Sequence, residues 1–99
     1  LVKSALAFLF LQRGTPCIYY GTELELGGGM DPDCRRVMPW DRVSNDNDML
    51  NFMKNLIQLR KGVADIIQYG KFSLEGIEPN VLALEWEHDH QASRMRIIF

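Results

Sequence analysis

The sequence has 99 residues, of which 46% are hydrophobic and 24% charged, and its formal net charge is −2. This composition is typical of a globular domain and argues against a disordered tail. Charges of both signs are interspersed, so no basic patch indicates a nucleic acid or an anionic membrane as partner. The longest apolar run, Ala5 to Leu11, is much shorter than the roughly 20 residues of a membrane-spanning helix.

Two cysteines, Cys17 and Cys34, occur in the sequence. They could in principle form one disulfide, but two cysteines in a chain with an ordinary hydrophobic core are expected to be free thiols. Free thiols favour a reducing compartment, and we therefore expect a cytoplasmic protein.

The first two expected elements are a helix and a buried strand. Leu1 to Arg13 is apolar on nearly every face, which means that a helix here needs partners on more than one side, and Gly14 supplies a helix stop. Thr15 to Tyr20 is largely apolar without alternation, which is typical of a parallel strand buried on both faces. A helix followed by such a strand predicts one unit of an α/β architecture.

A loop rich in glycine and polar side chains follows the expected strand, which ends at Gly21. Gly27 to Gly29 make the backbone permissive, which either lets it approach a ligand or simply reverses the chain. Acids, arginines and one aromatic follow, and rigid scaffolds commonly present such side chains to ligands. They are Asp31, Asp33, Arg35, Arg36, Trp40 and Asp41. The residues alone therefore predict a site for a polar ligand at the end of a strand.

A second helix is expected to end at Gly62. Ser44 or Asn45 can cap its N-terminus, and Asp46 and Asp48 fall in its first turn, where the helix dipole favours negative charge. Its apolar positions follow the i, i+3, i+4 spacing of one helix face; the stripe comprises Met49, Phe52, Met53, Leu56 and Ile57, with Arg60 at its end. Because methionine fills irregular gaps well, we interpret this stripe as a core face and not as a groove for a partner.

After Val63 the periodicity changes to short runs typical of half-buried antiparallel strands. These runs are Ile66 to Leu74, Asn80 to Glu87 and Ala92 to Phe99. The last two are predicted to form a hairpin across His88 to Gln91. A domain boundary is therefore expected near Gly62 to Asp65. His88 and His90 alternate on the expected turn, but without further ligands nearby they do not predict a metal site.

Two parts of the sequence together resemble a known family. TPCIYYGTE (residues 15–23), followed by GGGMDPDCRRVMPWD (residues 27–41), is similar to the eighth barrel strand and the following loop of the alpha-amylase family of glycoside hydrolases. The similarity is greatest to its neopullulanase, cyclomaltodextrinase and maltogenic amylase group. The most specific part is DPDCRR before MPWD, at this distance after a GTP-x-x-YYG-x-E strand.

The resemblance implies an architecture. The chain would be an α/β fragment in which residues 1–62 are the last helix-strand-helix of a (β/α)₈ TIM barrel and residues 63–99 begin a truncated antiparallel β-sandwich domain. The active site of such a barrel lies at the C-terminal ends of its strands, so the loop after Tyr20 is expected on the functional face. A fragment of this kind has lost apolar neighbours, and we expect it to self-associate. A homodimer is compatible with the resemblance for the full-length parent.

The resemblance further implies a parent enzyme that hydrolyses α-1,4 bonds of α-glucans, such as starch, pullulan or cyclodextrins, with retention. A retaining glycosidase needs two carboxyl groups about 5 to 5.5 Å apart. Residues two apart in an extended chain share a face at roughly 6.5 to 7 Å, so spacing alone does not exclude Asp31 and Asp33 as this pair. The family's catalytic Asp, Glu and second Asp lie in earlier motifs with no counterpart here, however, and we expect the fragment itself to be inactive.

Single site residues follow from the resemblance only where the motif matches. Asp31 and Arg35 match positions at which the family contacts a glucose unit on the non-reducing side of the scissile bond. A carboxylate and a guanidinium suit vicinal hydroxyls, and the alternative is a mutual ion pair that shapes the loop. Asp33 and Trp40 are weaker candidates for substrate binding, and Trp40 can either stack on a sugar or pack under the loop.

The remaining expectations concern structural residues, cofactors and rival functions. Arg36 and Asp41 are interpreted as structural. No cofactor and no metal is implied in this segment, although family members often bind calcium elsewhere in the chain. A glucan-binding module without hydrolysis and a purely structural domain stay open as alternatives.

Overall fold

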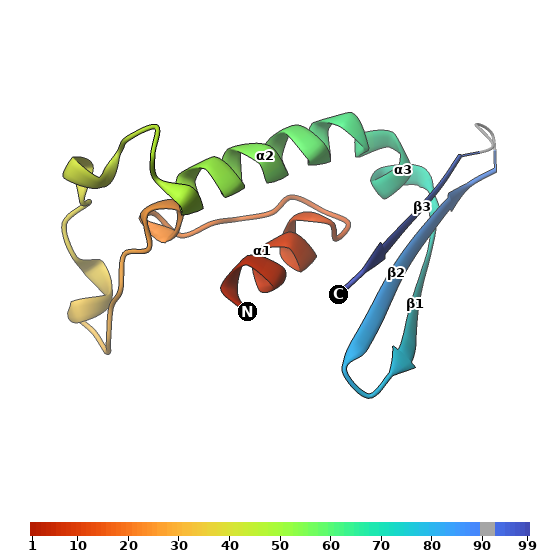
Figure 1. Ribbon diagram of the computed structural model, residues 1–99, viewed down its shortest axis with the longest axis horizontal. Coiled ribbons are helices and arrows are strands. Elements are labelled where there is room, and N and C mark those ends of the chain that lie inside the picture. Colours follow the sequence, from red (N-terminus) through yellow and green to blue (C-terminus); the bar gives the residue numbers. More distant parts are fainter. Residues whose placement is uncertain (90–92) are drawn as a thin grey trace.

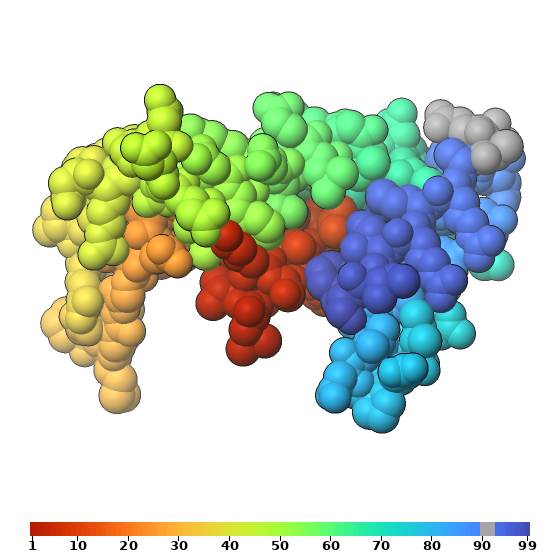
Figure 2. Space-filling model, in the orientation of Figure 1, coloured from red at the N-terminus to blue at the C-terminus, as the bar shows by residue number. Residues whose placement is uncertain are grey.

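The computed structural model describes residues 1–89 and 93–99. Within this part of the chain, helices come first and a sheet last (Figure 1), in the order α1 (Val2–Phe10), α2 (Asp48–Gly62), α3 (Ala64–Tyr69), β1 (Lys71–Glu78), β2 (Val81–His88) and β3 (Ser93–Ile98). A long loop between α1 and α2 contains three short 3₁₀ turns, η1 (Thr22–Leu24), η2 (Asp33–Arg35) and η3 (Trp40–Arg42). Figure 2 shows this loop and the sheet at opposite ends of the molecule.

Helices α1 and α2 pack against each other through a first hydrophobic cluster, as the apolar spacing of α2 predicts. Leu6 and Phe10 of α1 meet Met49, Met53 and Leu56 of α2, and all five side chains are buried. The interpretation of the methionine stripe as a core face is therefore confirmed. At the other end of this interface, Lys3 forms an ion pair with Asp48 at 2.5 Å.

The N-terminus of α2 lies slightly later than the sequence predicts. Asn47 is the cap, because its Oδ1 accepts a hydrogen bond of 2.8 Å from the backbone N–H of Leu50. Ser44 and Asn45 were the wrong candidates, and Asp46 precedes the helix. The physical reason is that the Asn47 amide also donates to the Arg42 carbonyl at 3.2 Å, which holds Asn47 in the capping position. The predicted end at Gly62 is confirmed.

Residues 15–20 do not form the predicted strand. Residues 15–19 have no regular secondary structure and run as an extended segment beside α1 and α2 (Figure 1). A strand needs a hydrogen-bonded neighbour, and the described part of this chain pairs none with the segment. Ile18 packs on the first hydrophobic cluster, whereas Cys17 and Tyr19 are exposed. Cys17 and Cys34 are both free, as predicted.

Arg60 fixes the chain where α1 ends. Its guanidinium donates hydrogen bonds to the carbonyls of Phe10, Gln12 and Gly14, and the bond to Gln12 measures 2.9 Å. The last carbonyls of a helix have no partner within the helix, and a cation is favourable there. The predicted helix end at Arg13, with Gly14 as the stop, is wrong, because α1 ends at Phe10 with Leu11 as its C-cap. Gly14 lies three residues beyond this cap, with a φ of +89°, the left-handed backbone that favours glycine.

A second hydrophobic cluster joins α3 to one face of the sheet. Ile66 and Ile67 of α3 pack with Leu84 and Trp86 of β2, and Leu11, from just beyond α1, completes the cluster. Partly buried side chains surround it, namely those of Phe8, Val63, Leu82, Met95, Ile97 and Phe99. The cluster therefore includes residues from both sides of the predicted domain boundary.

The prediction of one strand over Ile66 to Leu74 is wrong in its first half. Residues 64–69 are the helix α3, and β1 begins only at Lys71. Ile66 and Ile67 are both buried in the same cluster, which a helix allows, whereas successive side chains of a strand point to opposite faces. The corner between α3 and β1 needs Gly70, because a Cβ there would lie 2.4 Å from the Ile66 carbonyl oxygen.

The three strands form an antiparallel sheet in the order β1-β2-β3. The predicted hairpin is confirmed, since Trp86 pairs with Met95, but His88, which was expected on its turn, is the last residue of β2 and pairs with Ser93. Its alternation is also as predicted, with Met95 and Ile97 partly buried against the second cluster. The expectation for His90 lies outside the described residues. Among the described residues, no helix has both the length and the apolarity required to cross a membrane.

Candidate functional site

The loop between α1 and α2 is fixed at its base by buried and backbone contacts. Leu24 in η1 is almost fully buried. Gly21 precedes it with a φ of +83°, and its carbonyl accepts a hydrogen bond of 2.9 Å from the N–H of Leu26. From the far end of the loop, Arg42 donates to the carbonyls of Leu24 and Glu25 at 3.3 and 3.4 Å. The two ends of the loop are thus held together, and its polar middle projects into solvent.

The glycines of the loop allow a close approach of backbone to backbone. A Cβ on Gly28 would lie 3.1 Å from the Asp33 carbonyl oxygen and 3.1 Å from Cα of Cys34. A Cβ on Gly29 would lie 3.0 Å from Oδ2 of Asp33. A Cβ on Gly27 would lie 3.9 Å from Nη1 of Arg36, which is an ordinary contact. In this structure Gly28 and Gly29 therefore serve to pack the loop against η2.

Asp31 and Arg35 lie together in the η2 region of the loop. Nη2 of Arg35 is 2.5 Å from Oδ1 of Asp31, and the peptide bond between Asp31 and Pro32 is cis. The mutual ion pair of the alternative interpretation is therefore present. Both side chains remain open to solvent, with exposed fractions of 69% for Asp31 and 61% for Arg35. The pair can therefore shape the loop and still reach a ligand, and its contact with sugar stays a prediction.

Asp33 forms a second ion pair in the same turn. Its two carboxylate oxygens accept hydrogen bonds from Nε and Nη2 of Arg36 at 2.6 and 2.7 Å. These hydrogen bonds lower the pKa of the Asp33 carboxyl below its ordinary value of 3.8, and a backbone hydrogen bond from Gly29 acts in the same direction. The interpretation of Arg36 as structural agrees with this contact, whereas Asp33 has no oxygen left without a partner.

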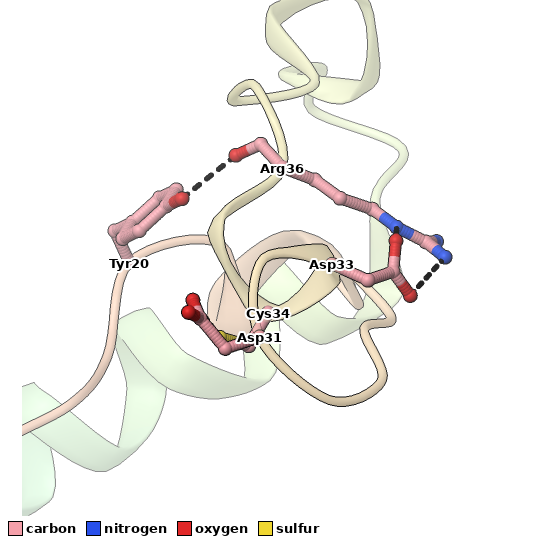
Figure 3. Close-up of polar contacts among 5 residues, drawn as sticks. All are labelled: Tyr20, Asp31, Asp33, Cys34 and Arg36. Carbon is pink, nitrogen blue, oxygen red and sulfur yellow. Dashed lines mark hydrogen bonds and ion pairs between the residues drawn. The ribbon is translucent and has the colours of Figure 1, made fainter.

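A further contact ties the turn to the extended segment before the loop. The Tyr20 hydroxyl donates a hydrogen bond of 2.7 Å to the carbonyl of Arg36. Figure 3 shows the Asp31 carboxylate on one side of the turn and the Asp33–Arg36 pair on the other. The sequence places Tyr20 only at the end of the expected strand, and no signal in it identifies the partner 16 residues away.

The other two candidates take no part in this network. The Trp40 side chain is not packed under the loop, because the residue is 72% exposed. Its stacking on a sugar stays a prediction, and Asp41 is likewise exposed. Among the described residues, no group of three or more His, Cys, Asp or Glu side chains could hold a metal ion. The described part of the site is therefore an exposed set of paired charges on a loop whose base is fixed.

Similar proteins have been found by sequence and by structure, although no family model matches the chain. The intracellular maltogenic amylase of Bacillus subtilis (strain 168) is 56% identical over 59 residues, which are 60% of this chain and 10% of that protein. A cyclomaltodextrinase from a Bacillus species is 43% identical over 79 residues, which are 80% of this chain and 14% of that protein. This chain thus spans only a small part of the length of the curated relatives that it matches.

A solved structure agrees with the sequence relatives. The crystal structure of a maltogenic amylase from S. marinus matches with a TM-score of 0.79 and 34% identity, over 98% of this chain and 14% of the other. The match covers the helices, the polar loop and the sheet together. The sequence relatives and the structural relative are of one kind, and this chain is therefore homologous to a segment of maltogenic amylases, cyclomaltodextrinases and neopullulanases.

Proposed function

We propose that this chain is a segment of a hydrolase that cleaves α-1,4-glucosidic bonds of α-glucans with retention of the anomeric configuration. The observation that carries the proposal is the match to the maltogenic amylase structure over 98% of the chain at 34% identity. In this proposal residues 1–62 are the last helix-strand-helix of a (β/α)₈ barrel. The extended residues 15–19 would then find the strand neighbours that they lack here, and β1, β2 and β3 would begin a β-sandwich domain.

Asp31 and Arg35 are proposed to bind a glucose unit on the non-reducing side of the scissile bond. Both project from a loop whose base is fixed, and both are more than half exposed. A carboxylate can accept about four hydrogen bonds and a guanidinium can donate five, so their mutual contact leaves most of this capacity for hydroxyl groups. In a barrel enzyme this loop would lie at the C-terminal end of a strand, on the catalytic face.

The catalytic carboxyl groups are proposed to lie in other parts of the full-length protein. Within the described residues, both Asp33 oxygens are taken by Arg36, so Asp33 is poorly suited to act as nucleophile or acid. The isolated chain should therefore bind a glucan at most and not cleave it. A cytoplasmic location is also proposed, supported by two exposed free thiols and by a relative that is named an intracellular enzyme.

The test is hydrolysis by the full-length gene product. Purified protein should release reducing sugar from β-cyclodextrin, pullulan or starch, and proton NMR of the first product should show the α-anomer. Binding of cyclodextrin in calorimetry without any release of sugar would instead identify a glucan-binding module. Cleavage of a nitrophenyl maltoside by the pure 99-residue chain would show that the placement of the catalytic groups is wrong.

A further inference from the structure

We infer that Asp33 and Arg36 are positioning residues, which hold the η2 turn so that Asp31 and Arg35 meet the glucan, and that Asp33 is not itself a sugar ligand. This inference rests on the proposed function and replaces the sequence-based expectation that Asp33 contacts substrate. It assigns the two ion pairs of one short turn to different tasks.

The hydrogen-bond geometry separates the two pairs. The Asp33–Arg36 contact is bidentate, with two short and nearly equal bonds of 2.6 and 2.7 Å. The Asp31–Arg35 contact joins one guanidinium nitrogen to one carboxylate oxygen. A bidentate fork fixes the relative orientation of two planar groups, whereas a single contact leaves both partners able to rotate toward a ligand. The lowered pKa of Asp33 agrees with a carboxylate of which each oxygen already accepts a hydrogen bond from Arg36.

The location of the bidentate pair suits a positioning role. Asp33 is the first residue of η2 and Arg36 directly follows its last, so the pair closes the turn from one end to the other. Arg35 is the last residue of the same turn, which means that any change in the turn moves its side chain. The Asp33 side chain also lies against Gly29, where a Cβ would approach Oδ2 to 3.0 Å. The pair therefore joins the glycine-rich segment of the loop to the η2 turn.

Tyr20 holds the same turn from outside the loop. Its hydroxyl donates to the Arg36 carbonyl at 2.7 Å, so Arg36 is bound through its side chain on one side and through its backbone on the other. The Asp31 carboxylate lies on the opposite side of the turn from the Asp33–Arg36 pair (Figure 3). The Asp33–Arg36 pair thus supports the turn from the side away from Asp31, and the Tyr20 hydroxyl supports it at the Arg36 carbonyl.

The experiment is a double-mutant cycle in the full-length enzyme with maltotriose as substrate. Arg36→Lys keeps the charge but cannot form the planar fork, and it should raise KM about three- to tenfold while kcat changes less than about twofold. Asp33→Asn should act in the same way, whereas Asp33→Glu, which keeps the carboxylate, should recover most of the loss. In an Arg35→Ala background the Arg36→Lys effect should nearly disappear, because the residue that it positions is gone. Asp46→Asn, an exposed change outside the loop network, is the matched control.

Each contrary outcome identifies what is wrong. If Asp33→Asn raises KM by the same factor in the wild-type and in the Arg35→Ala enzyme, Asp33 contacts the sugar directly. An unchanged KM in Arg36→Lys would overturn the positioning role. If Arg35→Ala leaves kcat/KM unchanged in an active enzyme, the proposed sugar contact fails and the inference fails with it. Tyr20→Phe removes only one hydroxyl group, so it provides the same test of the turn if the charged variants do not fold. Its expected effect is a smaller increase of KM that again depends on Arg35.

Discussion

Replacement of Arg35 by alanine separates a sugar-binding role from a structural one. In the full-length enzyme the substitution removes the guanidinium that contacts Asp31 at 2.5 Å. If the guanidinium also donates charge-assisted hydrogen bonds to the glucan, the loss should be about 1.5 to 3 kcal/mol of transition-state binding. That corresponds to roughly a 10- to 150-fold decrease of kcat/KM.

The structural effect of the same substitution should be much smaller. The two side chains are 61% and 69% exposed, and ion pairs with that access to water contribute about 0.2 to 1 kcal/mol to stability. A change of that size lowers the Tm of a protein of 150 to 250 residues by at most about 4 °C. The two expected free-energy ranges, about 1.5 to 3 and about 0.2 to 1 kcal/mol, do not overlap, so kinetics and calorimetry can tell the two roles apart.

The assay measures kcat/KM on maltotriose and β-cyclodextrin together with the Tm by scanning calorimetry. Arg94→Ala is the matched control, because Arg94 is also a paired and largely exposed arginine but lies on β3, away from the loop. It should leave kcat/KM unchanged. An Arg35→Ala enzyme with normal kcat/KM would remove Arg35 from the binding site, and a loss of activity that follows a large loss of Tm would make its role structural.

Three further predictions concern the backbone and the sheet. Gly28→Ala places a Cβ 3.1 Å from the Asp33 carbonyl oxygen and so forces the loop backbone away from η2. It should lower kcat/KM several-fold in the full-length enzyme, whereas Gly27→Ala should not. Gly70→Ala places a Cβ 2.4 Å from a backbone oxygen and should cost about 1 to 3 kcal/mol of unfolding free energy in urea titration, while Gly76→Ala in open space on β1 should be neutral or stabilising. A hydrogen bond from Arg94 lowers the pKa of Glu85 below its ordinary 4.5, so the contribution of this pair to stability should be complete above pH 4.5 and be lost as the pH falls through the lower folded value. Glu85→Gln should flatten that part of the curve of Tm against pH, and an unchanged slope would refute the assignment.

Helices α1 and α2 and the hairpin could be predicted from the sequence because their signals are local. The spacing of the apolar residues of α2 and the alternation along β2 and β3 each follow from which side chains must be buried together. The run from Ile66 to Tyr69 misled, since a short apolar run fits a strand or a buried helix equally well. Only the packed structure shows that Gly70 forms a corner without room for a side chain.

The extended segment before the loop shows a different limit. Thr15 to Tyr20 has the composition of a strand, but strand formation depends on a neighbouring chain segment that composition cannot supply. The site itself was predicted in part. Asp31 and Arg35 are four residues apart and do meet, whereas the pairing of Asp33 with Arg36 and the contact from Tyr20 depend on how the glycines let the loop fold back.

Helix α1 has a consequence for how the molecule unfolds. Its Leu6 and Phe10 belong to the first hydrophobic cluster. Leu11, just past its end, belongs to the second, and Phe8 packs against that second cluster with its ring edge-on to Phe99 at 5.9 Å between centroids. Helix α1 therefore contributes to both clusters. If one cluster came apart, α1 would lose the contacts that hold it in place, and the other cluster would be weakened as well. The helix pair and the sheet should lose structure in one cooperative transition, with circular dichroism at a helical and at a β-sheet wavelength giving the same midpoint.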